Sequence, residues 1–594
     1  MLFVTPPRRL LLLTAIAVVL GFAGGGAAWV LLHLISLLTN LALLHRWSVA
    51  TPVLAGFHPG WPLYAVAVAG AIAVSLLAKW SPVIRGHGIP EAMEAVLTKQ
   101  SRVAPRTAIA KPISAAVAIG TGAPFGAEGP IIVTGGSIGS LLGQVIPVSA
   151  SERKILLASG AAAGMSATFG APLAAVVLAV ELLVFEFSMR ALVPLVVSTA
   201  IAGGMHAALF GHGPLFQVPV TDLAGLEVLP AFAIVGLTAG LLATVISRGL
   251  FLVEHAYRRL PVSEFWHPVI GAIGFATVGL FVPRCLGVGY DVIDDLLNAR
   301  LAVGTAAAIA VAKLIAWWLA LGSQTSGGTL APILMIGAAF GTVLGNGLNH
   351  ALPGPDIALG TFAIVAMAAT FGASTQATFS AIVFVFELTR DYNVILPLML
   401  ATVLADLVYS SANRDSLMTE KLRRRGLHVT RHYSADPFAT TRVDAIMTTP
   451  VESLSNRVTV AEAHTAFLGG GHSAFPIVEA ETEQLLGMIS RRDLLSWTGG
   501  EDQPALLAGR RRVPTVGPAD PAQAVLLAMV DEHVEHVPVV DQYDRVVGIC
   551  TRTDLLNVRR RQLAHEVPER RQPAAANALR SMRPSTARRR SSSA

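Results

Sequence analysis

The chain has 594 residues, of which 53% are hydrophobic and 14% are charged, and its mean hydropathy is +0.60. Soluble domains carry roughly 25% charged residues, so this composition excludes a wholly soluble protein and places most of the chain in lipid. The formal net charge of +6 divides into +2 for residues 1–410 (19 basic, 17 acidic), −4 for 411–556 (15 and 19) and +8 for 557–594 (10 and 2). Because the positive excess lies in the tail, no nucleic-acid partner is expected.

The apolar segments predict a polytopic membrane domain. The run from Leu10 to Leu44 follows Arg8 and Arg9 and is far longer than the core of a signal peptide, so it predicts a retained membrane helix. Many of the later segments contain Gly or Pro, which predicts broken or partial helices; irregular backbone at membrane depth is typical of a permeation path. Further apolar segments are expected at 62–80, 107–147, 155–188, 191–210, 229–253, 267–283, 302–321, 330–351, 357–371 and 377–410.

The membrane domain is internally duplicated. The sequence AEGPIIVTGGSIGSLLG at 127–143 aligns with TLAPILMIGAAFGTVLG at 329–345, an offset of 202. The sequence ATFGA occurs at 167–171 and again at 369–373, the same offset. Duplicated transporters commonly place their substrate site where the halves meet, near the bilayer midplane. The two units are expected at about 10–210 and 229–410.

The chain becomes soluble after Tyr409. The basic run KLRRR at 421–425 predicts a cytoplasmic C-terminal region, and Arg8 and Arg9 predict the same for the N-terminus, by the positive-inside rule. We therefore expect a multi-pass protein of the inner (cell) membrane with both termini cytoplasmic.

A second, smaller duplication follows in the soluble region 426–556. The sequence GMISRRD at 487–493 returns as GICTRTD at 548–554, an offset of 61, and each copy is preceded by an apolar strand signal. This predicts two small α/β modules, at about 441–497 and 510–556. The tail, residues 557–594, is rich in Arg, Ser, Pro and Ala, so we expect it to be disordered and to touch anionic membrane lipid only weakly.

Glu128 is the most informative single residue. It lies in PFGAEGP, immediately before an apolar helix, and an ionisable side chain inside a membrane domain is costly. A helix start presents unpaired N–H groups that bind anions, so a carboxylate there can occupy the anion's position and leave on protonation. The alternative is that Glu128 only stabilises its helix. The repeat partner, Leu330, is not acidic, which favours the gating interpretation.

Two other segments place small residues before a Pro and a helix, RGHGIPE at 85–91 and QTSGGTLAP at 324–332. Each is a weak signal alone. Together, three Gly-rich helix starts predict a partly dehydrated anion held by backbone N–H groups. A cation transporter would need converging acidic groups, and only Glu128 is well placed among these loops.

The ordered motifs GHGIPE, GAEGP and GGTLAP resemble those of the CLC chloride channels and chloride/proton antiporters, over most of residues 10–425. The resemblance implies a mostly α membrane domain, residues 1–425, of two inverted-topology repeats with broken helices. It implies a homodimer with one chloride path per subunit, in which Glu128 is the external gating glutamate and Lys111 lies beneath the gate. The anion-binding positions that it implies are His87, Gly88, Ile89, Gly129, Thr329, Leu330 and Met418.

Three residues depart from the family pattern. Leu182 stands where the antiporters have their internal proton-transfer glutamate, and Glu181 aligns with that glutamate's neighbour. Met418 stands where most members have an inner Tyr, and Ala127 replaces a frequent Arg or Lys. These changes favour a passive, channel-like conductor. The alternative is a chloride/proton antiporter with another proton route, for which His87 is a candidate pH sensor.

The soluble modules resemble a pair of CBS domains. That resemblance implies an adenine-nucleotide site (ATP, ADP or AMP) at Ser490, Asp493, Thr551 and Asp554. The other hypothesis is a dimerisation platform without a ligand. No metal site, required cofactor or enzymatic activity is expected, because the HVEH sequence at 533–536 lacks the His-Glu-x-x-His spacing of intramembrane zinc proteases.

Overall fold

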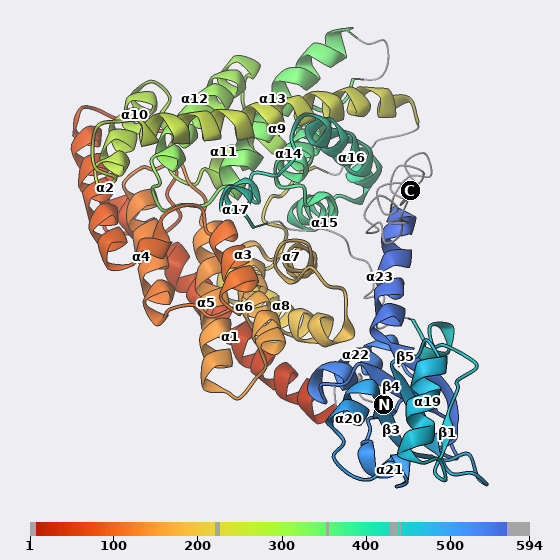
Figure 1. Cartoon of the computed structure of the whole chain (residues 1–594). Helices are drawn as coiled ribbons and strands as arrows, with labels where there is room; N and C mark the ends of the chain where they lie inside the picture. Colours follow the sequence, from red (N-terminus) through yellow and green to blue (C-terminus); the bar gives the residue numbers. More distant parts are fainter. Residues whose placement is uncertain (1–6, 220–225, 352–355, 428–437, 439–440, 567–594) are drawn as a thin grey trace, which may run out of the picture. The chain divides into compact units, whose positions relative to one another are not determined.

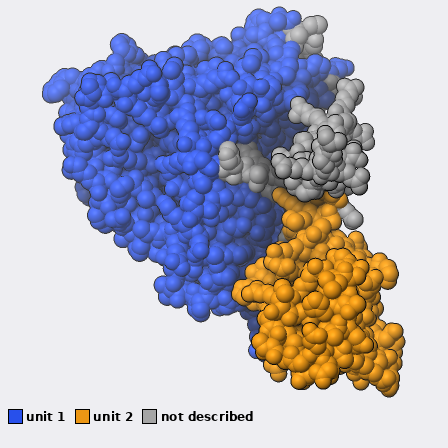
Figure 2. Space-filling model, in the orientation of Figure 1, with its two compact units in different colours: residues 1–432 blue, residues 433–594 orange. Residues whose placement is uncertain are grey.

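The structure is a computed structural model that describes residues 7–219, 226–351, 356–427, 438 and 441–566. The chain divides into two compact units, residues 1–432 and 433–594 (Figure 2). Unit 1 is almost entirely helical, as Figure 1 shows, and unit 2 contains two small β-sheets with short helices.

The first half of unit 1 contains long apolar helices interrupted by short ones. Glycine and proline lie at most of the interruptions, because they cannot continue a helix or can turn the chain sharply. The elements are α1 (Pro7–Ala42), α2 (Pro62–Trp80), η1 (Pro82–Ile84), α3 (Ile89–Thr98), α4 (Pro105–Gly120), α5 (Glu128–Val145), α6 (Ala150–Phe169), α7 (Pro172–Ala179), the π-helical turn η2 (Val180–Val184) and α8 (Met189–Phe210).

The second half repeats this arrangement. Across the described parts of the chain, seven helices are long and apolar enough to cross a membrane. The elements of the second half are η3 (Leu226–Val228), α9 (Leu229–Arg258), α10 (His267–Phe281), η4 (Pro283–Cys285), α11 (Tyr290–Leu297), α12 (Val303–Gly322), α13 (Leu330–Ala351), α14 (Leu359–Thr375), α15 (Thr378–Thr389), η5 (Tyr392–Val394), α16 (Ile395–Ala412) and α17 (Glu420–Arg424).

The prediction of broken helices is confirmed. The apolar segment 107–147 forms two helices, α4 and α5, with an irregular loop between them. The segment 155–188 breaks at Gly170, which has φ of +64° and therefore adopts the left-handed conformation that favours glycine. The segment 377–410 likewise divides into α15, η5 and α16. The ends of α4 and α6 and the start of α5 lie inside the protein, where Ile119, Phe169 and Glu128 are at most 2% exposed.

Each half contains a helix pair that packs closely at an equivalent glycine. A Cβ on Gly139 of α5 would lie 2.1 Å from the carbonyl oxygen of Leu156 in α6. At the equivalent position, 202 residues later, a Cβ on Gly341 of α13 would lie 2.4 Å from the carbonyl oxygen of Phe362 in α14. Both helix pairs therefore require glycine at the same place, which is the structural counterpart of the sequence duplication.

The two halves also contact each other at their short helices, through a carboxylate from each half. The carboxylate of Glu181, in η2, accepts hydrogen bonds from the N–H and the hydroxyl of Ser380 at the start of α15 (3.1 and 2.5 Å). In return, Glu387 near the end of α15 accepts from the N–H groups of Leu173 and Ala174 at the start of α7 (3.1 and 2.6 Å). Each carboxylate supplies acceptors to the unpaired N–H groups of the opposite helix.

Unit 2 contains the two modules that the second duplication predicts. In the first, β1 is parallel to β2 and β2 is antiparallel to β3; in the second, β4 and β5 are antiparallel. The registers correspond, because Ala474 pairs with Ser490 and His536 pairs with Thr551. The elements are η6 (Val443–Ala445), β1 (Leu454–Ser455), α19 (Val460–Gly469), β2 (Ala474–Val478), β3 (Leu485–Ser490), α20 (Arg491–Ser496), α21 (Ala505–Ala508), α22 (Ala522–Asp531), β4 (His536–Val540), β5 (Val546–Thr551) and α23 (Arg552–Glu566).

One boundary differs from the prediction. Disorder is expected from residue 557, whereas helix α23 continues to Glu566. Leu555 and Val558 are buried, so the start of this helix is fixed by packing against the second module, and the arginines that follow continue it. Residues 567–594 lie outside the described residues.

Candidate anion site

The three Gly-rich loops predicted to bind an anion meet in the structure. Gly126 and Gly328 exchange backbone hydrogen bonds in both directions (3.3 and 3.0 Å), which joins the loop before α5 to the loop before α13. The N–H of Gly327 donates to the carbonyl oxygen of Gly86 (3.4 Å), which adds the loop before α3. The starts of α3, α5 and α13 therefore converge on one place inside unit 1.

The convergence depends on glycine. A Cβ on Gly129 would lie 2.0 Å from the carbonyl oxygen of His87, and a Cβ on Gly88 would lie 2.6 Å from the carbonyl oxygen of Gly129. Gly88 also has φ of +97°, and its N–H donates to Glu91 Oε2 (2.7 Å), which closes the start of α3. Only residues without a Cβ permit this approach of the backbones.

We expect Gly129→Ala to lower the free energy of unfolding by roughly 1–3 kcal/mol or more and to abolish most anion flux, because the added methyl must displace the backbone at His87. The matched control is Gly136→Ala in the same helix, where the nearest atom would be at 3.5 Å. Thermal unfolding and anion efflux from vesicles measure the two effects. If the two variants behaved alike, the close packing of the loops would not be essential.

Glu128 is fully buried at the first position of α5. Its Oε1 accepts a hydrogen bond from the hydroxyl of Tyr290 (2.8 Å), whereas Oε2 has no protein partner among the described residues. Hypothetical Cβ atoms on Gly126 and Gly328 would lie 1.7 and 2.9 Å from Oε2, so both loops press against the carboxyl. The carboxyl thus occupies the space that the converging backbones leave.

Other buried polar atoms in these loops lack protein partners in the described part of the chain. They are Nδ1 of His87 and Oγ1 of Thr329, on residues that are 1% and 0% exposed. Buried polar atoms are nearly always hydrogen-bonded, to protein, water or ligand. The orphaned atoms of His87 and Thr329 are therefore suited to contact an anion or the water that accompanies it, whereas the ionised Oε2 of Glu128 would compete with that anion.

Two buried lysines donate hydrogen bonds to backbone carbonyl oxygens close to the site. Nζ of Lys111 donates to the carbonyl oxygens of Ile84 and Gly86 (2.7 and 2.8 Å). Nζ of Lys313 donates to the carbonyl oxygens of Cys285 and Gly287 (3.1 and 2.7 Å). Sequence reasoning singled out Lys111 and missed Lys313, although the two positions differ by the repeat offset of 202.

The remaining anion-binding candidates are all buried. Ile89 begins α3 and Leu330 begins α13, and both are at most 1% exposed. Met418 is fully buried in the loop between α16 and α17, next to Leu417, whose N–H donates to the carbonyl oxygen of Ser374 (3.0 Å) at the end of α14. No hydroxyl is available at position 418 to contact an anion.

Leu182 lies in the π-helical turn η2. Leu182 is 1% exposed and carries no titratable group. Its neighbour Glu181 receives the two hydrogen bonds from Ser380 that fix the start of α15. The carboxylate next to Leu182 in the sequence therefore helps to fix the start of α15.

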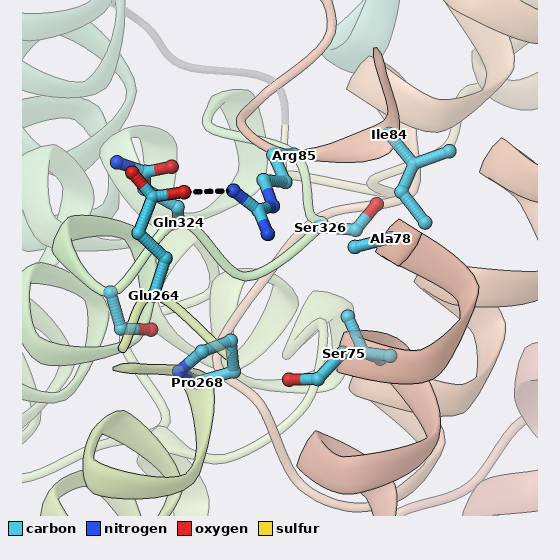
Figure 3. A pocket seen from close by; sticks show the side chains of 10 residues that line it. Ser75, Ala78, Ile84, Arg85, Glu264, Pro268, Gln324 and Ser326 are labelled. Carbon is cyan, nitrogen blue, oxygen red and sulfur yellow. Dashed lines mark hydrogen bonds and ion pairs between the residues drawn. The ribbon is translucent and has the colours of Figure 1, made fainter. Parts of the chain in front are cut away.

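A small pocket adjoins the loop that contains His87. In Figure 3, the side chains of Arg85 and Glu264 point toward each other at the wall of this pocket and form an ion pair. Ser326, from the loop before α13, also lines this pocket and accepts a hydrogen bond from the hydroxyl of Ser114 (2.9 Å). The pocket therefore lies beside two of the three converging loops, which its polar contacts help to fix.

Unit 2 contains a basic pocket between its two modules. Four arginines line it, and burial lowers the pKa of His536, which also faces it. Ser490 and Asp493 line the pocket too, but they bond to each other (2.5 Å) as the cap of α20. Thr551 and Asp554 form the same pair at the start of α23 (2.7 Å) and are not among the residues that line the pocket. The arginines are Arg491, Arg492, Arg510 and Arg552.

Comparison with known proteins agrees with these features. Residues 69–410 match the family described as voltage gated chloride channel, and residues 443–500 and 509–561 match the CBS domain. A Ralstonia nicotianae protein named putative chloride channel protein ClcB-like is 30% identical over 375 residues, 62% of this chain and 86% of that protein. A Vibrio campbellii H(+)/Cl(-) exchange transporter ClcA is 30% identical over 389 residues, 62% of this chain and 83% of that protein.

Solved structures show the same fold. A slow cyanobacterial Cl−/H+ antiporter, 25% identical, superposes with a TM-score of 0.62 over 71% of this chain and 99% of its own. A eukaryotic CLC transporter, 21% identical, has a TM-score of 0.57 over 92% of this chain and 98% of its own.

Proposed function

Because the chain belongs to the voltage gated chloride channel family and is a multi-pass membrane protein that transports chloride, we propose that Glu128 gates a passive chloride path through it. The resemblance that the three loop motifs carry is thus confirmed, as is the mostly α fold with CBS modules. The observation that carries the gating proposal is the fully buried carboxyl of Glu128 where three helix starts meet.

The surroundings of Glu128 support competition between carboxylate and chloride. Backbone N–H groups at helix starts attract any anion, so the ionised carboxylate and a chloride ion compete for the same place. Protonation removes the charge of Glu128 and with it the advantage of remaining there. External acid should therefore open the path.

Passive conduction is supported by what surrounds position 182. Leu182 cannot carry a proton, and the Glu181 carboxylate is engaged with Ser380. A proton that enters at Glu128 thus has no carboxyl at this inner position to receive it. Met418, which has no hydroxyl, also leaves the inner side without the polar closure that a Tyr would supply.

Chloride/proton exchange is the second candidate. Relatives at 28–30% identity are named H(+)/Cl(-) exchange transporters, which favours it. In that case the proton needs another route, for which the buried His87, with Nδ1 unpartnered in the described structure, is a titratable candidate in the converging loops.

Purified full-length protein in vesicles loaded with chloride tests the proposal. Valinomycin and K+ clamp the membrane voltage. An outward chloride gradient should then drive chloride efflux while the pH of the weakly buffered external solution stays constant. A strict exchanger would instead take up protons against their gradient as chloride leaves. Absence of any chloride efflux would contradict the transport function itself.

We also propose that the basic pocket of unit 2 binds an adenine nucleotide, with the arginines contacting its phosphates. Because cationic side chains outnumber acidic ones there, ATP should bind more tightly than AMP, by about tenfold. Calorimetry with the full-length protein measures both. Arg492→Ala should weaken ATP binding at least about tenfold, whereas Arg457→Ala, at an exposed site paired with Glu481, should not. Equal binding by the two variants, or no binding at all, would leave the dimerisation platform as the better hypothesis.

The proposal also covers assembly and location. We propose a homodimer in the inner membrane with both termini cytoplasmic and without enzymatic activity. The basic residues Lys421, Arg423, Arg424 and Arg425 beyond the last membrane helix support this orientation by the positive-inside rule. Chemical cross-linking in membranes and labelling of cysteines added at either terminus test the two statements separately.

A further inference from the structure

Tyr290 contacts the Glu128 carboxyl from the other half of unit 1. It is the first residue of α11 and follows Gly289, whose φ of +81° turns the chain toward the site. The hydroxyl donates to Oε1 of Glu128 at 2.8 Å, a normal length for an O–H···O bond. It is the one side-chain hydrogen bond recorded for that carboxyl among the described residues.

The ring of Tyr290 is held in place by aromatic neighbours. Phe169, the last residue of α6, lies edge-to-face with it at 6.2 Å between ring centroids and 71° between planes. Phe216 lies at 6.5 Å and 65°. Such contacts favour one orientation of a ring. The hydroxyl therefore meets Glu128 without having to be ordered at the moment of contact.

Tyr290 also lines a pocket that does not include Glu128. The wall of this pocket comes from α1, α8 and the segment 286–291, and includes Thr168 and His206. Water in the pocket can hydrate the phenol when its bond to Glu128 breaks. The tyrosine thus contacts the carboxyl through its hydroxyl and also lines this pocket.

The charged groups around the pair are few. Lys313 of α12 lies near the carboxyl of Glu128, and Asp291 follows Tyr290 in α11. Arg284 of η4 approaches Asp291 at 3.8 Å and Asp295 at 2.5 Å. His206 of α8 lines the adjacent pocket, where its Nδ1 lies 2.8 Å from the carbonyl oxygen of Ala167. Thr329 and the side chains at the start of α13 are uncharged.

We propose that Tyr290 is a positioning residue that holds the ionised Glu128 in the anion's place and releases it on protonation; this rests on the proposed gating role of Glu128. A hydrogen bond to a carboxylate is stronger than one to a neutral carboxyl, so the bond favours the closed, ionised gate. The tyrosine thereby sets how acidic the outside must become before chloride flows.

Tyr290→Phe tests this, because it removes the hydroxyl and keeps the ring between Phe169 and Phe216. We expect chloride efflux at neutral external pH to rise about tenfold and the pH of half-activation to move upward by about one unit. The control is Tyr64→Phe, which removes another hydroxyl of unit 1, bonded to Thr277 at 2.9 Å, and should change neither quantity.

The same two substitutions are then made together with Glu128→Gln. If Tyr290 acts through the gate, Tyr290→Phe has no further effect in that background, and a thermal unfolding scan confirms that each variant is folded. An unchanged pH profile in Tyr290→Phe, or an equal effect in both backgrounds, overturns the proposal for Tyr290. A persistent pH response in Glu128→Gln alone overturns the gate instead, so the two failures are distinguishable.

Discussion

Glu128→Gln is expected to give chloride flux that no longer depends on external pH. Gln is uncharged at every pH, so it cannot compete with chloride for the N–H groups of the helix starts as a carboxylate does. At neutral pH the flux should exceed that of the unmodified protein by about tenfold or more, which corresponds to at least about 1.4 kcal/mol less preference for the closed gate. At acid pH, where Glu128 is protonated, the two proteins should converge.

Chloride efflux from vesicles at a series of external pH values measures this. The matched control is Glu387→Gln, which changes a partly buried carboxyl that caps α7 and keeps an oxygen able to accept from Leu173 or Ala174. That variant should retain the pH response of the unmodified protein. A pH response retained by Glu128→Gln would remove Glu128 from the gate.

Lys313→Met is expected to be strongly destabilising. The substitution leaves the carbonyl oxygens of Cys285 and Gly287 without their buried donor, at roughly 1–3 kcal/mol for each. It also removes the positive charge beside Glu128 and loosens the backbone that leads to Tyr290. The free energy of unfolding should therefore fall by about 2–6 kcal/mol, the sum for the two carbonyls.

Lys111→Met should behave similarly, because Lys111 makes the equivalent bonds to Ile84 and Gly86. Lys79→Met is the control, since its ammonium group lies over the ring of Phe265 near the surface and should contribute little. Thermal unfolding of the detergent-solubilised protein reports the stabilities. A Lys313→Met variant as stable as the control would show that the bonds to the carbonyls are weak.

Much of the site could be predicted from local sequence. The three loops can be recognised in the sequence because they contain glycine and proline, which adopt backbone conformations that few other residues can. The duplication also aligns the loops before α5 and α13. The same duplication contains a signal that sequence reasoning missed. Gly287 and Gly289 stand 201 residues after Gly86 and Gly88, and all four have positive φ. That pair would have predicted a fourth loop, which carries Tyr290.

Contacts between the halves could not be predicted in this way. Tyr290 lies 162 residues from Glu128, and no local pattern marks its hydroxyl as the partner of that carboxyl. Glu181 caps the start of α15 and Glu387 caps the start of α7. These two contacts likewise become apparent only once α7 and α15 are seen side by side in the fold. Sequence periodicity describes which face of an element is apolar, not which distant residue meets it.

The CBS modules show a different limit of prediction from sequence motifs. The repeated Ser-x-x-Asp and Thr-x-x-Asp patterns suit a nucleotide cleft, and they also suit the start of a helix. In the structure both pairs cap helices, with Asp493 accepting from Ser490 and Asp554 from Thr551. Arginines dominate the adjacent pocket, so its affinity for phosphate depends on side chains that the motif does not include.

The reversal potential of the reconstituted protein in a planar bilayer tests the central claim, passive chloride conduction without proton exchange, most directly. Under a tenfold chloride gradient at equal pH, the current should reverse at about 59 mV, the value for a single-charge ion. Adding a pH gradient across the bilayer should alter the size of the current, through Glu128, and leave this potential unchanged. A reversal potential that moves with the pH gradient would contradict the account and establish exchange.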